Sequence, residues 1–221
     1  MGTTLQLDAD DGHTLSTYRA DPQAKPRAGI AVVQEVFGVN EHVRRVCDDF
    51  AARGYVAIAP ALFERIERGV ELGYTDEALA RGRELRTALG WDDPLRDVAA
   101  ALAVLRQAGK VGVVGYCWGG SVAWLSATRL DADCAVCYYG GQIVQFCEER
   151  ARCPVLMHFG ERDPIIAAED VERIRSAQPE IPIYTYPAGH GFNCDARADY
   201  DPQSAALAKE RTLAFLAEHV G

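Results

Sequence analysis

One cysteine stands where it could act as a nucleophile. Cys117 is the middle residue of Gly115-Tyr116-Cys117-Trp118-Gly119, after an apolar run typical of a buried strand (Lys110 to Val114) and before a segment typical of a helix (Gly120 to Arg129). A tight turn from strand to helix exposes the side chain at its apex, and flanking glycines let the two backbones approach closely. The helix N-terminus also stabilises negative charge on the sulfur. A glycine-rich turn that merely contains a buried cysteine is the alternative interpretation.

Two further residues have the chemistry to assist this cysteine. His190 lies in Ala188-Gly189-His190-Gly191-Phe192, and Asp163 lies in Gly160-Glu161-Arg162-Asp163-Pro164. A thiol needs a neighbouring base to ionise at neutral pH, and an imidazole held in one tautomer by a carboxylate supplies that base. The sequence therefore predicts a triad of Cys117, His190 and Asp163. Simpler explanations exist, because a lone loop histidine is often solvated and an aspartate before proline often begins a turn or caps a helix.

The elements expected around these residues alternate between strands and helices. Strands are expected at 29–34, 55–59, 110–114, 134–139, 155–159 and 183–186, and helices at 40–53, 75–89, 94–107, 120–129, after Ile166 and at 204–219. A hairpin is expected around Asp11-Gly12. Alternating elements of this kind predict an α/β protein, with a mostly parallel central sheet and helices on both faces. Sites in such sheets gather at the carboxyl ends of strands, and each triad residue, like Glu35, follows an expected strand.

The order of these residues along the chain is nucleophile, acid, histidine. That order is the one an α/β-hydrolase sheet requires for the three side chains to converge at one rim. We therefore expect the α/β-hydrolase fold. A chain of 221 residues with 48% hydrophobic residues can form one continuous core, so we expect a single domain over residues 1–221.

Composition argues against several classes of partner. A net charge of -9 disfavours binding to nucleic acid or to an anionic membrane. The sequence has no apolar run of the roughly 18 residues that a membrane helix needs, and no leader-like N-terminus. Seven cysteines, an odd number, fit a reducing compartment better than a disulfide framework. We expect a cytoplasmic protein that acts on a small molecule, as a monomer or a small homo-oligomer.

A second pair of cysteines has the CxxC spacing of redox and zinc sites. Cys134 and Cys137 fall inside an expected strand rather than at the start of a helix, so their side chains are expected to point to opposite faces. No second ligand pair with suitable spacing is present in the sequence. Thiol–disulfide exchange at this pair is therefore a weaker hypothesis than chemistry at Cys117.

Four segments together resemble the dienelactone hydrolase family, and the resemblance covers nearly the whole chain. They are Gln34 to Asn40, Gly112 to Gly120, the loop containing Asp163, and Gly189 to Phe192. The resemblance implies that Cys117 attacks the carbonyl of an enol-lactone, that the ring opens, and that water hydrolyses the thioester, without a cofactor or metal. An alternative is a cysteine-dependent esterase or thioesterase acting on another activated acyl compound. A non-catalytic binding protein with the same fold is the alternative from another class.

The resemblance also implies roles for residues around the triad. Glu35 would assist ionisation of the thiol, and the backbone N–H groups of Trp118 and Val36 would form the oxyanion hole. One arginine on a lid-side helix and another after the histidine would bind a substrate carboxylate. We expect Arg81 for the first, with Arg83 competing, and Arg197 for the second, although the family's position for it holds Cys194 here. Tyr138 is expected to line the apolar part of the pocket, unless it is plain core.

Overall fold

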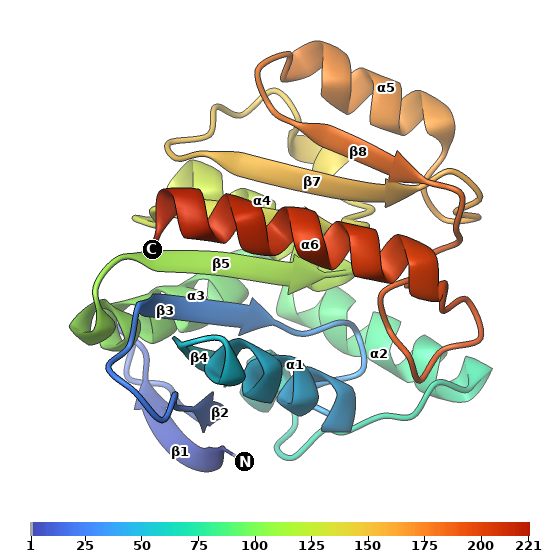
Figure 1. Cartoon of the computed structure of the whole chain (residues 1–221). Coiled ribbons are helices and arrows are strands. Elements are labelled where there is room, and N and C mark those ends of the chain that lie inside the picture. Colours follow the sequence, from blue (N-terminus) through green and yellow to red (C-terminus); the bar gives the residue numbers. More distant parts are fainter. Residues whose placement is uncertain (1) are drawn as a thin grey trace.

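The computed structural model describes residues 2–221, in which eight strands form one sheet (Figure 1). The strands are β1 (Thr3–Asp8), β2 (Thr14–Ala20), β3 (Ala28–Val33), β4 (Tyr55–Pro60), β5 (Val111–Tyr116), β6 (Cys134–Tyr138), β7 (Val155–Gly160) and β8 (Ile183–Tyr186). Their order across the sheet is β1-β2-β4-β3-β5-β6-β7-β8. The pairs from β4–β3 through β7–β8 are parallel, whereas β1–β2 and β2–β4 are antiparallel. The predicted mostly parallel α/β sheet is therefore confirmed.

The helices cover both faces of this sheet. They are α1 (Glu41–Ala52), α2 (Asp76–Leu89), α3 (Asp92–Leu105), α4 (Trp118–Arg129), α5 (Ala168–Ala177) and α6 (Pro202–His219), with short 3-10 turns η1 (Leu62–Arg65), η2 (Arg106–Ala108) and η3 (Ile143–Phe146). Helices α1 and α6 lie in front of the sheet in Figure 1, and α3 and α4 lie behind it. Within residues 2–221, no helix has both the length and the apolar character needed to cross a bilayer.

The expected elements are present, and their ends differ from expectation by a few residues. Strand β5 continues to Tyr116 and α4 already begins at Trp118, so Cys117 alone forms the junction between them. The central strands β3 to β7 are buried along their whole length, which explains why they read as continuous apolar runs. Asn40 caps the N-terminus of α1, because its side chain accepts from the backbone N–H of Val43.

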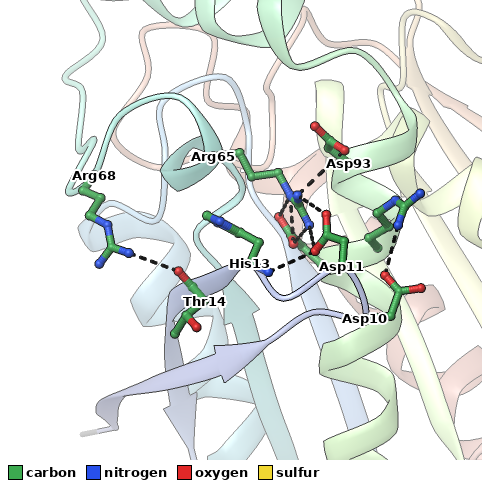
Figure 2. Close-up of polar contacts among 9 residues, drawn as sticks. Asp10, Asp11, His13, Thr14, Arg65, Arg68 and Asp93 are labelled. Carbon is green, nitrogen blue, oxygen red and sulfur yellow. Dashed lines mark hydrogen bonds and ion pairs between the residues drawn. The ribbon is translucent and has the colours of Figure 1, made fainter.

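A buried arginine ties the N-terminal hairpin to helix α3. Arg65, the last residue of η1, donates from Nη2 to Asp97 Oδ1 on α3 (2.7 Å) and from Nη1 to Asp11 Oδ2 in the hairpin turn (2.7 Å). Asp93 lies beside the same guanidinium (Figure 2), 3.8 Å from Nη1. The side chain of Asp97 has no exposed surface. Burial raises the pKa of Asp97 and the Arg65 hydrogen bond lowers it, with a net upward shift, so the charged carboxylate depends on Arg65.

Replacing this arginine with methionine (Arg65→Met) is expected to lower the free energy of unfolding by about 3 kcal/mol at pH 7, because it leaves an uncompensated charge buried at Asp97. The loss should be smaller at about pH 4, because the raised pKa of Asp97 increases its protonated, uncharged fraction there. Urea denaturation at the two pH values measures both effects.

The matched control is Arg96→Met. Arg96 pairs with Asp10 at 3.3 Å, but both side chains are largely exposed, so this change should alter the free energy of unfolding by at most about 1 kcal/mol. Equal losses in Arg65→Met and Arg96→Met would show that the buried network contributes nothing beyond an ordinary surface pair.

Candidate active site

The three residues of the predicted triad lie in contact. His190 Nε2 is 3.1 Å from Cys117 Sγ, and His190 Nδ1 is 2.7 Å from Asp163 Oδ2. The residues come from the turn after β5, the loop after β7 and the loop after β8, three segments far apart in the sequence. The carboxyl ends of these parallel strands open onto the same rim, which is why the side chains meet.

The backbone at Cys117 has the geometry of a strained strand-to-helix turn. Cys117 has φ 54° and ψ -121°, a conformation that non-glycine residues rarely adopt. Gly115 and Gly119 allow it, because a Cβ on Gly115 would lie 1.8 Å from the carbonyl oxygen of Gly119 and a Cβ on Gly119 would lie 2.4 Å from that of Val33. The two glycines singled out in the sequence are therefore required by close backbone contact.

The acid and the histidine are held firmly relative to each other. Asp163 Oδ1 accepts from the backbone N–H groups of Ile165 (2.8 Å) and Ile166 (3.1 Å), which leaves Oδ2 for His190. Both side chains are almost completely buried. Burial by itself lowers the pKa of His190, but the charge of Cys117 and the hydrogen bond with Asp163 outweigh it and raise that pKa to about 10. The same coupling acts in the other direction, since a protonated imidazole favours negative charge on the adjacent sulfur.

A second carboxylate and an arginine form a buried pair beside the triad. Arg197 Nη1 lies 3.5 Å from Glu35 Oε1, while Glu35 Oε2 is buried and has no hydrogen-bond partner among residues 2–221. Burial alone would lower the pKa of Arg197, whereas the charges of Glu35 and Cys117 raise it, and the net shift is upward. Arg197 therefore does reach inward from the loop after His190.

The cavity at Cys117 is small and has three arginines on its wall. It has a volume of about 40 Å³ and is lined by Val36, Leu79, Arg83, Arg86, Cys117, Trp118, Gly141, Gln142, Ile165, His190 and Arg197. Helix α2 lies beyond the carboxyl ends of β3 and β5 (Figure 1). It approaches the backbone of Val36 because Gly82 has no side chain, and a Cβ there would lie 2.0 Å from the Val36 oxygen.

Arg81 does not belong to this cavity, which corrects the expectation for the arginine on α2. Arg81 is exposed and pairs with Glu67 and with Glu84, the latter at 3.2 Å. A rise of two residues turns a helix by about 200°, so Arg81 faces away when Arg83 faces inward. Leu79, Arg83 and Arg86 share the inward face because they are spaced by four and three residues. Their helical spacing in the sequence was a signal that could have identified them.

Tyr138 does not line this cavity either. Its hydroxyl group lies 2.6 Å from Thr212 Oγ1 of α6, on the opposite face of the sheet from Cys117. The next residue, Tyr139, packs its ring 5.2 Å from that of His190. Tyr138 is the last residue of β6, and Tyr139 begins the following loop with a φ of 38°, so the two successive side chains have different partners.

The two residues expected to form an oxyanion hole, Trp118 and Val36, both lie at the cavity beside Cys117. Trp118 is the first residue of α4, so its N–H has no acceptor within the helix. The indole ring of Trp118 stacks on Phe63 at 5.3 Å between ring centroids, which fixes the turn from one side.

The CxxC pair of the sequence lies within the sheet. Cys134 and Cys137 are both completely buried in β6. Burial raises the pKa of Cys134 to about 12 and also raises that of Cys137. Buried thiols with raised pKa values are poor nucleophiles, so the structure gives no support to thiol–disulfide exchange at this pair.

Comparisons with known proteins agree with this geometry. The model of the dienelactone hydrolase family matches residues 15–220. The carboxymethylenebutenolidase of Pseudomonas putida is 34% identical over 227 residues, covering 96% of this chain and 95% of that protein, and that of Pseudomonas sp. (strain P51) is 32% identical with 96% and 93% covered. A crystal structure of a Klebsiella pneumoniae protein assigned as a dienelactone hydrolase superposes with a TM-score of 0.88 at 30% identity over 98% of each chain. The chain therefore belongs to the dienelactone hydrolase family, a family of α/β hydrolases that act on carboxylic ester and lactone bonds.

Proposed function

We propose that the protein opens activated enol-lactones of the dienelactone type through a thioester on Cys117. The observation that carries the proposal is the contact of Cys117 Sγ with His190 Nε2, with Asp163 on the other ring nitrogen. The sulfur attacks the lactone carbonyl, and the C–O bond to the enolate breaks. His190, neutral once Cys117 is acylated, then removes a proton from the water that hydrolyses the thioester, and it passes this proton to the departing sulfur as the C–S bond breaks. An enolate is a good leaving group, so acylation needs little proton donation.

The Glu35–Arg197 pair provides a way to couple substrate binding to the nucleophile. A carboxylate on the substrate competes with Glu35 for the guanidinium of Arg197, because both are anions that need the same donors. Glu35 Oε2 has no partner in the described chain, so a Glu35 released from Arg197 would be a buried carboxylate with no positive charge or hydrogen bond to stabilise it. Such a carboxylate gains by accepting the proton of Cys117, which is the assisting role that the family resemblance implies.

The two arginines of α2 supply the rest of the carboxylate site. Arg83 and Arg86 line the cavity, and neither makes an ion pair within residues 2–221, whereas Arg81 on the same helix makes two. Unpaired guanidinium groups beside a nucleophile favour an anionic substrate. We therefore assign substrate selection to Arg83, Arg86 and Arg197.

Replacing Arg83 and Arg86 together with methionine is expected to raise KM for cis- and trans-dienelactone by at least about tenfold, since a hydrogen bond to a charged group contributes roughly 1.5–3 kcal/mol. Hydrolysis of neutral p-nitrophenyl esters should change by less than about twofold, because these esters have no carboxylate to bind. Steady-state kinetics of the purified protein on both substrate classes measures the difference.

Arg81→Met is the matched control, because it removes an arginine from the same helix without touching the cavity, and it should leave both activities unchanged. Equal losses on dienelactones and neutral esters would contradict the carboxylate site. A wild-type protein that hydrolyses p-nitrophenyl esters but neither dienelactone would favour the alternative of a general cysteine-dependent esterase or thioesterase.

A further inference from the structure

A second group of chemically reactive side chains lies outside the cavity at Cys117. His42 of α1 and the adjacent residues Cys194 and Asp195 each place one ligand atom within 4.8 Å of the other two. None of the three lines the cavity at Cys117. His42 and Asp195 instead line a separate cavity of about 450 Å³ between α1 and α6.

We propose that His42, Cys194 and Asp195 form a binding site for a borderline or soft divalent cation such as Zn²⁺. Thiolate, imidazole and carboxylate are the three ligand types that zinc takes in proteins, and ligand atoms around tetrahedral zinc lie roughly 3.3–3.8 Å apart. The separations between the three residues therefore need to shrink by at most about 1.5 Å. A water molecule in the cavity between α1 and α6 completes the fourth position.

The His42 side chain is buried and faces Asp195 with one ring nitrogen. Only 6% of the His42 surface is exposed, and its Nε2 has no hydrogen-bond partner within residues 2–221. Its Nδ1 lies 3.3 Å from Asp195 Oδ1. Nδ1 is therefore the ring nitrogen that would bind a cation shared with Asp195, and burial holds the ring in place.

Burial and the charge of Glu35 raise the pKa of the Cys194 thiol to about 11, so a bound cation would have to displace its proton. The Cys194 thiol lies 3.4 Å from the hydroxyl of Tyr74, which also accepts from Asn40 Nδ2. When a cation binds, Cys194 loses its proton and the Tyr74 hydroxyl can turn to donate to the sulfur. The positive charge of Arg45 would repel a cation at this site, because Arg45 Nη2 donates to Asp195 Oδ1 at 2.7 Å. Asp195 keeps its second oxygen for the cation, and the Arg45 side chain is half-exposed.

A cation at this site would connect two parts of the active site. His42 follows the Glu35 segment at the start of α1, and Cys194 lies four residues after His190 and three before Arg197. A bound ion would therefore fix the loop after β8 against α1. This role does not depend on the chemistry proposed for Cys117.

The test uses Cys117→Ala protein, so that the active-site thiol cannot bind the probe, and Co²⁺ as a spectroscopic substitute for Zn²⁺. We expect one equivalent of Co²⁺ to give the near-ultraviolet charge-transfer band of a thiolate–cobalt bond, and Zn²⁺ to displace it. Adding Cys194→Ser should remove the band. Adding Asp195→Asn, an exposed change that leaves the core untouched, should weaken binding by about tenfold or more.

Cys153→Ser in the same Cys117→Ala background is the matched control. Besides Cys117, Cys153 is the one partly exposed thiol among the described residues, and its loss should leave the band unchanged. The proposal is overturned if the band survives Cys194→Ser, if Asp195→Asn binds Co²⁺ as tightly as its parent, or if no saturable binding occurs below roughly 1 mM. Because the parent protein lacks Cys117, none of these results depends on lactone hydrolysis.

Discussion

Replacing Cys117 with alanine is expected to lower kcat for dienelactone opening by a factor on the order of 10⁵–10⁶, as loss of the nucleophile does in other triad enzymes. Cys117→Ser should retain only a small fraction of the activity, because a serine hydroxyl has a far higher pKa than a thiol and the Glu35-assisted site is not matched to it. Lactone hydrolysis by the purified variants, followed at saturating substrate, measures both effects.

Two observations keep this result interpretable. The Cys117→Ala variant should remain folded, and the pKa of His190 should fall below its wild-type value of about 10, because the charge on Cys117 is the strongest influence that raises it. Titration of His190 by NMR reports that change. Cys153→Ala, which removes another partly exposed thiol, should leave hydrolysis intact. Full activity in Cys117→Ala would establish that sulfur is dispensable and would leave a binding protein or another mechanism.

Replacing His190 with alanine is expected to lower turnover by at least about 10³-fold and to leave the acyl-enzyme on Cys117. Deacylation needs a base to activate water, and His190 is the group in contact with Cys117 Sγ that can supply one. A lactone keeps its leaving group attached after ring opening. The trapped adduct should therefore add the full mass of the substrate, which mass spectrometry of the intact protein detects.

His219→Ala is the matched control, since His219 ends α6 and takes no part in the triad. It should turn over normally and show no adduct. Rapid, complete hydrolysis by His190→Ala without an adduct would mean that the thioester does not depend on this imidazole, and the mechanism proposed above would fail at that step.

The triad could be predicted because its signals are local. Gly115 and Gly119 are required by close backbone contact. Cys117, Asp163 and His190 lie one, three and four residues after the ends of β5, β7 and β8. In a parallel sheet, the end of a strand fixes where the next residues emerge. Chain order and strand ends were therefore enough to bring three distant residues to one rim.

The substrate-binding residues could not be chosen from the sequence with the same success. Arg81 and Arg83 differ by only two positions, yet only Arg83 lines the cavity at Cys117. Tyr138 bonds to α6, whereas the next residue, Tyr139, packs against His190. A helix turns by about 100° and a strand by about 180° per residue, so an error of one or two positions in placing an element reverses the side chain.

Sequence alone determined the α/β class, the strand-to-helix turn at Cys117 and the identity of the other two triad residues. Backbone periodicity places the strand ends, and chain order assigns the acid and the histidine to two of them. Only the tertiary structure decided that Arg197 meets Glu35, that Arg83 and Arg86 line the cavity, and that His42 lies beside Cys194. Each of these contacts joins a loop or helix face to a remote segment. Packing of whole elements, which no short stretch of residues encodes, sets the distance between them.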